Sequence, residues 1–354
     1  MISGHKEETA TSRRRASIPG LPAADADADA AADTDAVSVG GGRVAPQPSD
    51  APEVRDHTTN DLTAWERVSF DCVHAVLSGL VRIIGPAGVF RFGQAFSALE
   101  WAINYKRRRR FRQAVREMFP EGIAPADLQR ASREWVGYNR CNKLFFLLFD
   151  VLPRERLEGL FRLVRKELLD AALARGKGVY IAMSHVGPYQ IGGMFLSQIG
   201  YRMAAVRDPN ESGLTRYVQR RLDRRGGTRM KVFFSGAFPR MIFRCLEEGY
   251  VLGSALDVAR VRSAHLRTQD VTVFGRRREF LTGPLHVAVR CRVPILQAFV
   301  VPRRDFRYTI EFHGPLHDPQ QGGDEDDCVR RAMAQYVANL EAHMRRHPCH
   351  ITRI

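Results

Sequence analysis

Apolar residues between about positions 150 and 350 occur in short runs and in longer segments with helical spacing. The clearest run is Val179-Tyr180-Ile181-Ala182-Met183, and such a run is typical of a strand buried on both faces. The pattern predicts strands at 179–184, 203–206, 231–234, 251–256, 271–274, 294–301 and 307–313, and helices at 125–150, 154–175, 188–199, 212–225, 238–248, 283–291 and 325–347. Because strands and helices alternate, we expect an α/β fold with a central, mostly parallel sheet flanked by helices.

The region before this alternation predicts a helical N-terminal part over residues 61–150. An apolar stripe at helical spacing is formed by Val73, Leu77, Leu80, Val81 and Ile84. Gly85-Pro86 interrupts the stripe, and a second helix is expected from about Val89. Neither half reaches the roughly 20 apolar residues that a membrane span needs.

A basic cluster, Lys106 to Arg110 with Arg112, follows this apolar region directly. An apolar helix pair beside basic residues is typical of a protein that lies on an anionic membrane surface. A core-facing helix followed by a solvated charged turn explains the same residues equally well. Nucleic-acid binding is a weaker third interpretation, because no known reader motif accompanies the cluster.

The longest stretch without Asp, Glu, Lys or Arg runs from Gly178 to Tyr201, which is long enough for a transmembrane helix. Gly187-Pro188 lies where a span would need unbroken helix. We therefore expect a buried strand, a tight turn and a helix that begins at Pro188.

Residues 1–60 differ from the rest in composition, since they hold an Ala/Asp run and no aromatic residue. We expect this leader to be disordered, because it has too little apolar surface to offset the entropy of ordering. The leader has ten acidic and six basic residues, so its net charge is −4. Because the whole chain has a net charge of +15, residues 61–354 carry a net charge of +19. We expect 61–354 to form one domain, with a helical part at 61–150 and an α/β core at 151–354.

The positive charge favours an anionic partner, such as a membrane surface, a nucleic acid or an acidic protein. The six cysteines include no Cys-x-x-Cys pair, which argues against a zinc ribbon or a thioredoxin-type site. No metal site is predicted.

His185 follows the strand predicted at 179–184, and parallel α/β sheets present functional side chains at such strand ends. Gln190 lies five residues further on, in the first turn of the predicted helix, where the two side chains can meet. A polar partner on one ring nitrogen would leave the other as a general base for a substrate hydroxyl. A turn histidine without a chemical role is the structural alternative. The sequence has no Gly-x-Ser-x-Gly, His-Glu-x-x-His or Walker A motif.

Further blocks follow in order over residues 107–348. They are Arg107-Arg108-Arg109-Arg110 leading to Phe119-Pro120, the His185 block, Val206-Arg207-Asp208-Pro209-Asn210, Gly249 to Asp257, Phe274-Gly275-Arg276 with Thr282-Gly283-Pro284, Val293-Pro294-Ile295, and Arg345-Arg346-His347-Pro348. Together they resemble the lipid A biosynthesis (late) acyltransferase family, within the lysophospholipid acyltransferase superfamily. The His185 block is similar to the family's His-x4-acid motif.

This resemblance implies a membrane-associated acyltransferase at the cytoplasmic face of the bacterial inner membrane. His185 would deprotonate the hydroxyl of a lipid or glycolipid acceptor, which attacks the thioester of an acyl carrier protein or acyl-CoA. The resemblance implies neither a covalent acyl-enzyme nor a cofactor beyond that thioester co-substrate. The substrate cleft would be lined by Arg207, Asn210, Asp257, Gly275, Arg276, Thr282, Gly283 and Pro284. The structural alternatives are solvated arginines, Thr282 as a helix cap and Asp257 as a strand-end cap.

The sequence departs from the family motif at Gln190, where the family has Asp or Glu. A neutral amide can orient a histidine but cannot stabilise the imidazolium that forms. The matching acid-to-amide change in a serine protease triad lowers turnover by about 10⁴, or roughly 5–6 kcal/mol of barrier. Three hypotheses follow: a slow enzyme, an enzyme in which Asp257 supplies the carboxylate, or a protein that binds lipid or acyl carrier without turnover.

Overall fold

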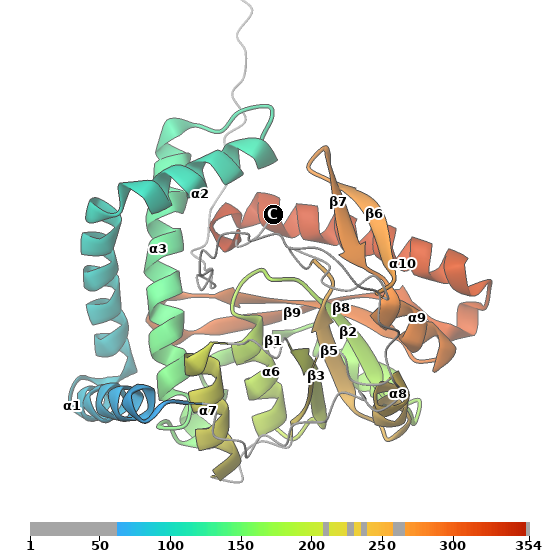
Figure 1. Cartoon of the computed structure of the whole chain (residues 1–354), viewed down its shortest axis with the longest axis horizontal. Helices are drawn as coiled ribbons and strands as arrows, with labels where there is room; N and C mark the ends of the chain where they lie inside the picture. The colour runs from blue at the N-terminus through green and yellow to red at the C-terminus, as the bar shows by residue number, and fades with distance from the viewer. Residues whose placement is uncertain (1–61, 208–211, 225–229, 235–238, 258–265, 352–354) are drawn as a thin grey trace, which may run out of the picture.

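The computed structural model describes residues 62–207, 212–224, 230–234, 239–257 and 266–351 (Figure 1). The leader predicted to be disordered, at 1–60, lies outside these residues. Seven strands form the central sheet in the order β1-β9-β8-β2-β5-β3-β4. They are β1 (Phe161–Val164), β2 (Val179–Met183), β3 (Met203–Arg207), β4 (Lys231–Phe234), β5 (Val251–Ala255), β8 (Ile295–Pro302) and β9 (Tyr308–His317). Every pairing is parallel except β8 with β9, which confirms the predicted mostly parallel sheet.

Helices cover both faces of this sheet, because its central strands are apolar on both sides. In β2, Tyr180 and Ala182 belong to one core cluster, whereas Val179 and Ile181 belong to the other. The first core includes residues of α8 (Pro239–Glu247), α9 (Gly283–Arg290) and α10 (Glu325–Arg346). The second includes residues of α5 (Lys166–Leu173), α6 (Tyr189–Gln198) and α7 (Gly213–Arg224).

A separate two-stranded hairpin, β6 (Thr268–Val273) with β7 (Arg276–Leu281), rises beside the sheet (Figure 1). Its two turn residues, Phe274 and Gly275, both have positive φ, 49° and 73°. This is the type I′ geometry that matches the twist of the flanking strands. The backbone N–H of Phe274 donates to Glu341 Oε1 of α10 at 2.6 Å, which holds the turn against the body.

The N-terminal part consists of α1 (Ala64–Ile103), α2 (Tyr105–Met118) and α3 (Pro125–Leu148), as the sequence predicts. α1 is kinked at Gly85, whose φ of 69° and ψ of 172° lie outside the helical region. The basic cluster is helical rather than a turn, since all six of its residues lie within α2. Phe111, Val115 and Met118 of α2 are buried in the core cluster that also contains α9 and α10.

The single helix predicted over 154–175 is wrong. The structure has α4 (Arg154–Glu158), then β1, then α5. β1 pairs in parallel with β9, from Phe161 opposite Tyr308 to Val164 opposite Glu311. Arg165 then adopts a left-handed conformation, with φ 59°, before α5 begins. This pairing with a distant strand outweighs the local helical pattern.

A second difference concerns β7, which the sequence pattern does not predict. Its six residues, Arg276 to Leu281, include three arginines and a glutamate and lack the apolar run of a buried strand. They form a strand because the whole segment pairs in antiparallel fashion with β6.

A buried polar network attaches the first half of α1 to the body. The ring Nε2 of His74 donates to Asp150 Oδ1 at 2.8 Å, and Arg221 Nε of α7 donates to Asp150 Oδ2 at 2.8 Å. Tyr217 of α7 donates to Asp71 of α1 at 2.7 Å. Burial disfavours the Asp150 carboxylate, but the bonds to His74 and Arg221 outweigh it and hold the pKa of Asp150 below its ordinary value.

We expect Asp150→Ala to lower the free energy of unfolding by about 3 kcal/mol, because removing one member of a buried ionic network leaves the charges of its partners uncompensated. Chemical denaturation in detergent, followed by tryptophan fluorescence, measures this change. The control is Glu158→Ala, which removes an exposed ion pair with Arg154 and is expected to cost less than about 1 kcal/mol. Equal losses in the two variants would contradict a supporting role for the network.

Candidate active site

The candidate site lies where two neighbouring parallel strands end. Met183, the last residue of β2, is directly opposite Ala255, the last residue of β5. His185 and Asp257 each follow two residues after these positions, so the equal register brings them to the same edge of the sheet. Ligands in open α/β sheets bind at this edge, outside the carboxyl ends of the strands.

His185 and Asp257 form a close pair. Nδ1 of His185 lies 3.1 Å from Asp257 Oδ1, and the backbone N–H of His185 donates to both carboxylate oxygens at 2.9 Å. The Asp257 side chain is 4% exposed and that of His185 is 19% exposed. A carboxylate on Nδ1 favours the tautomer that carries its proton there, so Nε2 is the nitrogen available as a base. The ring edge contacts Tyr189, with ring centroids 5.6 Å apart.

Hydrogen bonds from β5 and α10 hold the end of β2 in place. Tyr336 of α10 donates to the carbonyl oxygen of Met183 at 2.9 Å and accepts from Ser184 Oγ at 2.6 Å. The backbone N–H of Leu256 donates to the same carbonyl at 3.1 Å. Burial, and next the charge of Asp257, raise the pKa of Tyr336 far above its ordinary value, so the phenol keeps the proton that it donates. Sequence reasoning missed Tyr336, because a tyrosine about 150 residues away carries no local signal.

The turn from His185 into α6 needs a glycine at position 187. Gly187 has φ 65°, and a Cβ on it would lie 2.4 Å from the carbonyl oxygen of Val300. Any side chain there would push the turn off β8. Gln190 is in the first turn of α6, as predicted. Within the described ranges no hydrogen bond joins its side chain to the His185 ring, and the carboxylate beside that ring is Asp257.

The predicted Thr282-Gly283-Pro284 turn lies next to this pair. Leu281 N–H donates to the carbonyl oxygen of Leu256 at 2.9 Å, which places Thr282 beside Asp257. Thr282 is buried and precedes α9, but its side chain makes no capping hydrogen bond. Thr282 therefore occupies the N-cap position of α9, as the structural alternative expects, but its side chain does not cap the helix.

Two of the other predicted substrate-binding residues, Gly275 and Arg276, are not gathered around His185. Gly275 and Arg276 lie at the tip of the β6–β7 hairpin, where Arg276 pairs with Glu117 of α2 at 3.0 Å. Arg207 is the last residue of β3, and its side chain lies outside the described part of the chain. Asn210 also lies outside it.

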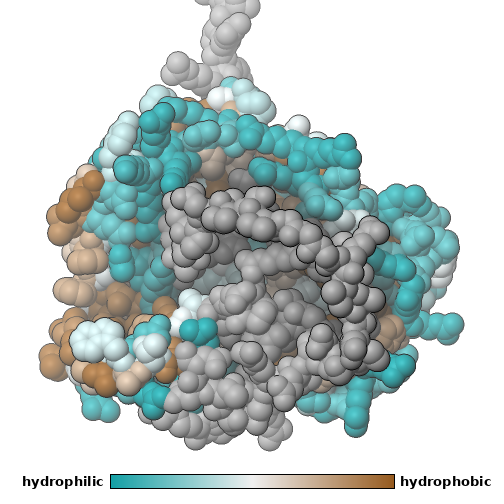
Figure 2. Space-filling view, viewed as in Figure 1, coloured by the Kyte–Doolittle hydropathy of each residue, from teal (hydrophilic) through white to brown (hydrophobic). Residues whose placement is uncertain are grey.

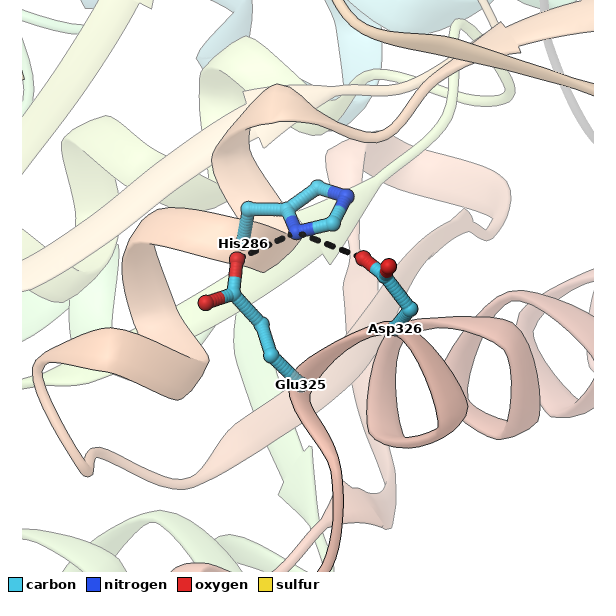
Figure 3. A group of neighbouring side chains, drawn as sticks. All are labelled: His286, Glu325 and Asp326. Carbon is cyan, nitrogen blue, oxygen red and sulfur yellow. Dashed lines mark hydrogen bonds and ion pairs between the residues drawn. The ribbon is translucent and has the colours of Figure 1, made fainter.

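His286, Glu325 and Asp326 form a cluster with metal-ligand chemistry (Figure 3). His286 Nδ1 lies 2.6 Å from Glu325 Oε1 and 3.8 Å from Asp326 Oδ1. Arg290 binds both oxygens of Glu325 at 2.9 and 2.8 Å and is the main reason that the pKa of Glu325 lies below its ordinary value. Because a guanidinium already occupies this carboxylate, the cluster is better suited to joining α9 to α10 than to binding a cation.

The C-terminal segment packs behind the His185 turn. His343 Nε2 and His350 Nδ1 are 2.8 Å apart, and His350 Nδ1 lies 3.7 Å from where a Cβ on Gly187 would be. Both rings are fully buried, and this burial is the main reason that the pKa of each lies well below its ordinary value. Neighbouring positive charges lower both pKa values further. Trp135 of α3 donates to the carbonyl oxygen of Ile351 at 3.1 Å. The segment therefore links α3 to the candidate site.

The fold and the site define a class of protein: an α/β protein with a histidine–carboxylate pair at adjacent strand ends, equipped for general-base chemistry. Residues 73–349 match the family described as bacterial lipid A biosynthesis acyltransferase. The match covers most of the chain, so the chain belongs to this family. The family assigns it to the acyltransferases that act on lipid. No curated protein matches the chain.

We expect the free energy of unfolding to fall as the pH decreases from about 6.5 toward 5, because unfolded histidines take up protons there. His343 and His350, whose native pKa values are lowered, stay neutral in the folded protein. Each histidine contributes a slope of up to about 1.4 kcal/mol per pH unit. Urea unfolding at several pH values measures this slope, and a His343→Gln/His350→Gln variant should flatten it. The same slope in that variant would contradict the assignment.

Proposed function

We propose that this protein transfers a fatty acyl chain from an acyl carrier protein or acyl-CoA thioester to a hydroxyl of a lipid or glycolipid. His185 is the general base in this proposal. The observation that carries it is the contact of His185 Nδ1 with the buried Asp257 carboxylate at 3.1 Å. The family supports the coarser assignment, an acyltransferase that uses an acyl thioester and a lipid acceptor.

In the proposed reaction the acceptor O–H gives its proton to His185 Nε2 as its oxygen attacks the thioester carbonyl. The tetrahedral intermediate collapses, the carbon–sulfur bond breaks, and the leaving thiolate takes the proton from the imidazolium. An ester and a free thiol result, and no covalent acyl-enzyme forms. Asp257 orients the ring and stabilises the imidazolium. A positioned general base of this kind contributes about 10²–10⁴ in rate.

The position of Asp257 also offers an explanation for the neutral Gln190 in the family motif. In this proposal the carboxylate that the family motif places five residues after the histidine is replaced by Asp257, which follows the neighbouring strand β5, so Gln190 need not supply charge. This supports the hypothesis in which Asp257 takes over. A second candidate function, binding of lipid or acyl carrier without turnover, rests on Gln190 itself.

We also propose that the protein lies on the cytoplasmic face of the bacterial inner membrane as a peripheral or monotopic protein. By length and composition alone, α1 is a helix that could cross a membrane. However, α1 is kinked at Gly85, and the hydrogen bond of His74 to Asp150 holds the first half of α1 against the rest of the protein. A flat position at the interface fits this arrangement better than a span.

Exposed apolar side chains mark the surface that would enter the interface. Figure 2 shows brown, hydrophobic areas at the left and lower left, over α1. The exposed large apolar side chains of α1 are Trp65, Val68, Val73, Val76, Ile83, Ile84, Phe92, Phe96, Leu99 and Ile103. The exposed Lys106 and Arg110 follow in α2 and would lie near the anionic headgroups. The net charge of +19 on residues 61–354 also suits an acidic carrier protein. No nucleic-acid partner is proposed.

The test of catalysis is mass spectrometry of the lipid extract from cells that express the wild type or His185→Ala. We expect an acylated lipid with the wild type alone. We expect Asp257→Asn to lower the transfer rate by about 10³–10⁴, because the ring loses its orienting charge. Gln190→Ala is the matched control and should change the rate by less than about tenfold. An inactive wild type together with a gain of activity in Gln190→Glu would support the binding function instead.

We expect Ile83→Asp and Phe92→Asp each to weaken binding to vesicles of phosphatidylglycerol and phosphatidylethanolamine by at least about tenfold. An apolar side chain of this size contributes roughly 1.5–3 kcal/mol when it leaves water, and 1.4 kcal/mol corresponds to a factor of ten. Vesicle flotation measures the bound fraction. Leu266→Asp, an exposed apolar residue outside α1, is the control. If all three variants float like the wild type, α1 is not the membrane surface.

A further inference from the structure

A basic cleft lies between α2 and the tip of the β6–β7 hairpin, away from His185. Its volume is about 650 Å³, and its walls include Arg109, Arg116 and Glu117 of α2 and Phe274, Gly275 and Arg276 of the hairpin. Figure 1 shows α2 and this hairpin at the same end of the molecule, above the sheet. Three guanidinium groups and one carboxylate meet here, so the cleft has a net charge of +2.

The arginines of α2 divide into two groups. Arg107 pairs with Glu100 at 2.7 Å and lies over the Trp135 ring, and Arg108 lies over the Trp101 ring. These two arginines serve the packing of α2 against its neighbours. Arg109 and Arg116 lie two helical turns apart on one face, toward the hairpin. Among the residues that the structure describes, neither of them has an acidic partner.

The hairpin adds a further arginine with an unused donor. Side chains alternate along a strand, so Arg276, Arg278 and Phe280 share one face of β7. Phe280 packs on Tyr336, and Arg276 reaches Glu117, so this face is turned toward the body. Arg278 Nε is buried and lacks a hydrogen-bond partner in the described ranges. Buried donors in proteins normally have an acceptor, so a ligand oxygen is a suitable partner for this Nε. Guanidinium groups match phosphate oxygens in geometry and charge.

β7 connects this cleft to the catalytic pair. The strand begins at Arg276 and ends at Leu281, whose N–H donates to Leu256 beside Asp257. At about 3.3 Å per residue, Thr282 is roughly 20 Å from Arg276 and roughly 13 Å from Arg278 along the strand. About thirteen bonds separate phosphorus from sulfur in phosphopantetheine. An extended chain spans about 3.5 Å for every three bonds, so this arm reaches about 15 Å.

We propose that the cleft between α2 and the β6–β7 turn binds the phosphate ester of a substrate, and that this phosphate belongs to the phosphopantetheine arm of the thioester donor. The identity of the donor rests on the proposed function, whereas the phosphate chemistry rests on the arginines. The phosphate would lie between the cleft residues Arg109 and Arg116 and Arg278, which shares a face of β7 with the cleft residue Arg276 but does not itself line the cleft. From there the arm would follow β7 and deliver its thioester to His185. The phosphate of a small phospholipid lies only a few bonds from its hydroxyl group, which is too short for this distance.

The test measures the affinity of the full-length protein for two soluble thioesters that differ only in the phosphate, S-acetyl-4′-phosphopantetheine and S-acetylpantetheine. The protein carries His185→Ala, so that no turnover disturbs the calorimetric titration. We expect the phosphorylated probe to bind at least about tenfold more tightly, a factor that one charge-assisted hydrogen bond can supply. This ratio should fall toward one in Arg109→Ala/Arg116→Ala.

The matched control is Arg110→Ala, which removes the same charge from the same helix at a residue that does not line the cleft. It should keep the ratio of the parent protein. A second pair of probes, dihexanoyl phosphatidic acid and dihexanoylglycerol, tests the acceptor as the source of the phosphate. If the double variant loses the preference for the phosphorylated lipid but not for the phosphorylated thioester, the assignment to the donor is overturned.

Equal affinity for both members of each pair in the parent protein overturns the phosphate site altogether. Acyl transfer is not read in these titrations, so the two proposals fail separately. If the wild type transfers acyl chains but the His185→Ala protein binds phosphorylated and unphosphorylated probes equally, only the proposed phosphate site is refuted. An inactive wild type whose cleft still distinguishes the probes refutes the proposed catalysis and leaves the phosphate site standing.

Discussion

The bond between Asp257 and His185 is the interaction on which the rest of the site depends. One carboxylate accepts from the backbone N–H of His185 with both oxygens and also contacts the ring nitrogen Nδ1. A buried carboxylate is unfavourable without such donors, so the contact holds only if β2 and β5 end in register. That register is supported by the bond of Leu256 to Met183 and by Tyr336, which donates to the same carbonyl oxygen.

The helical N-terminal part is joined to this site from two sides. α2 enters the core cluster that lies over β2 and β5, and α3 is tied through Trp135 to the carbonyl oxygen of Ile351. The C-terminal segment in turn packs His350 behind Gly187, in the turn that carries His185. The apolar face of α1 therefore has a defined position relative to His185, which the proposed transfer to a membrane lipid requires.

The arginines of the described structure are used in two different ways. Several arginines, such as Arg107 and Arg221, are used in ion pairs between elements. Those on the hairpin face of α2 have no such use in the described structure and lie at a cleft instead. An anionic ligand, as proposed for this cleft, would offset the repulsion among these exposed guanidinium groups.

The sequence by itself determined the order of most helices and strands, the kink position at Gly85 and the place of His185 at a strand end, since periodicity and turn residues act over a few positions. It failed at 154–175, because β1 exists only through its pairing with β9. It named Asp257 as a possible carboxylate, but the contact of Asp257 with His185 was decided by tertiary structure, as was the separation of Arg276 from His185. Contacts between residues far apart in the chain depend on strand order and register, and no local pattern encodes either.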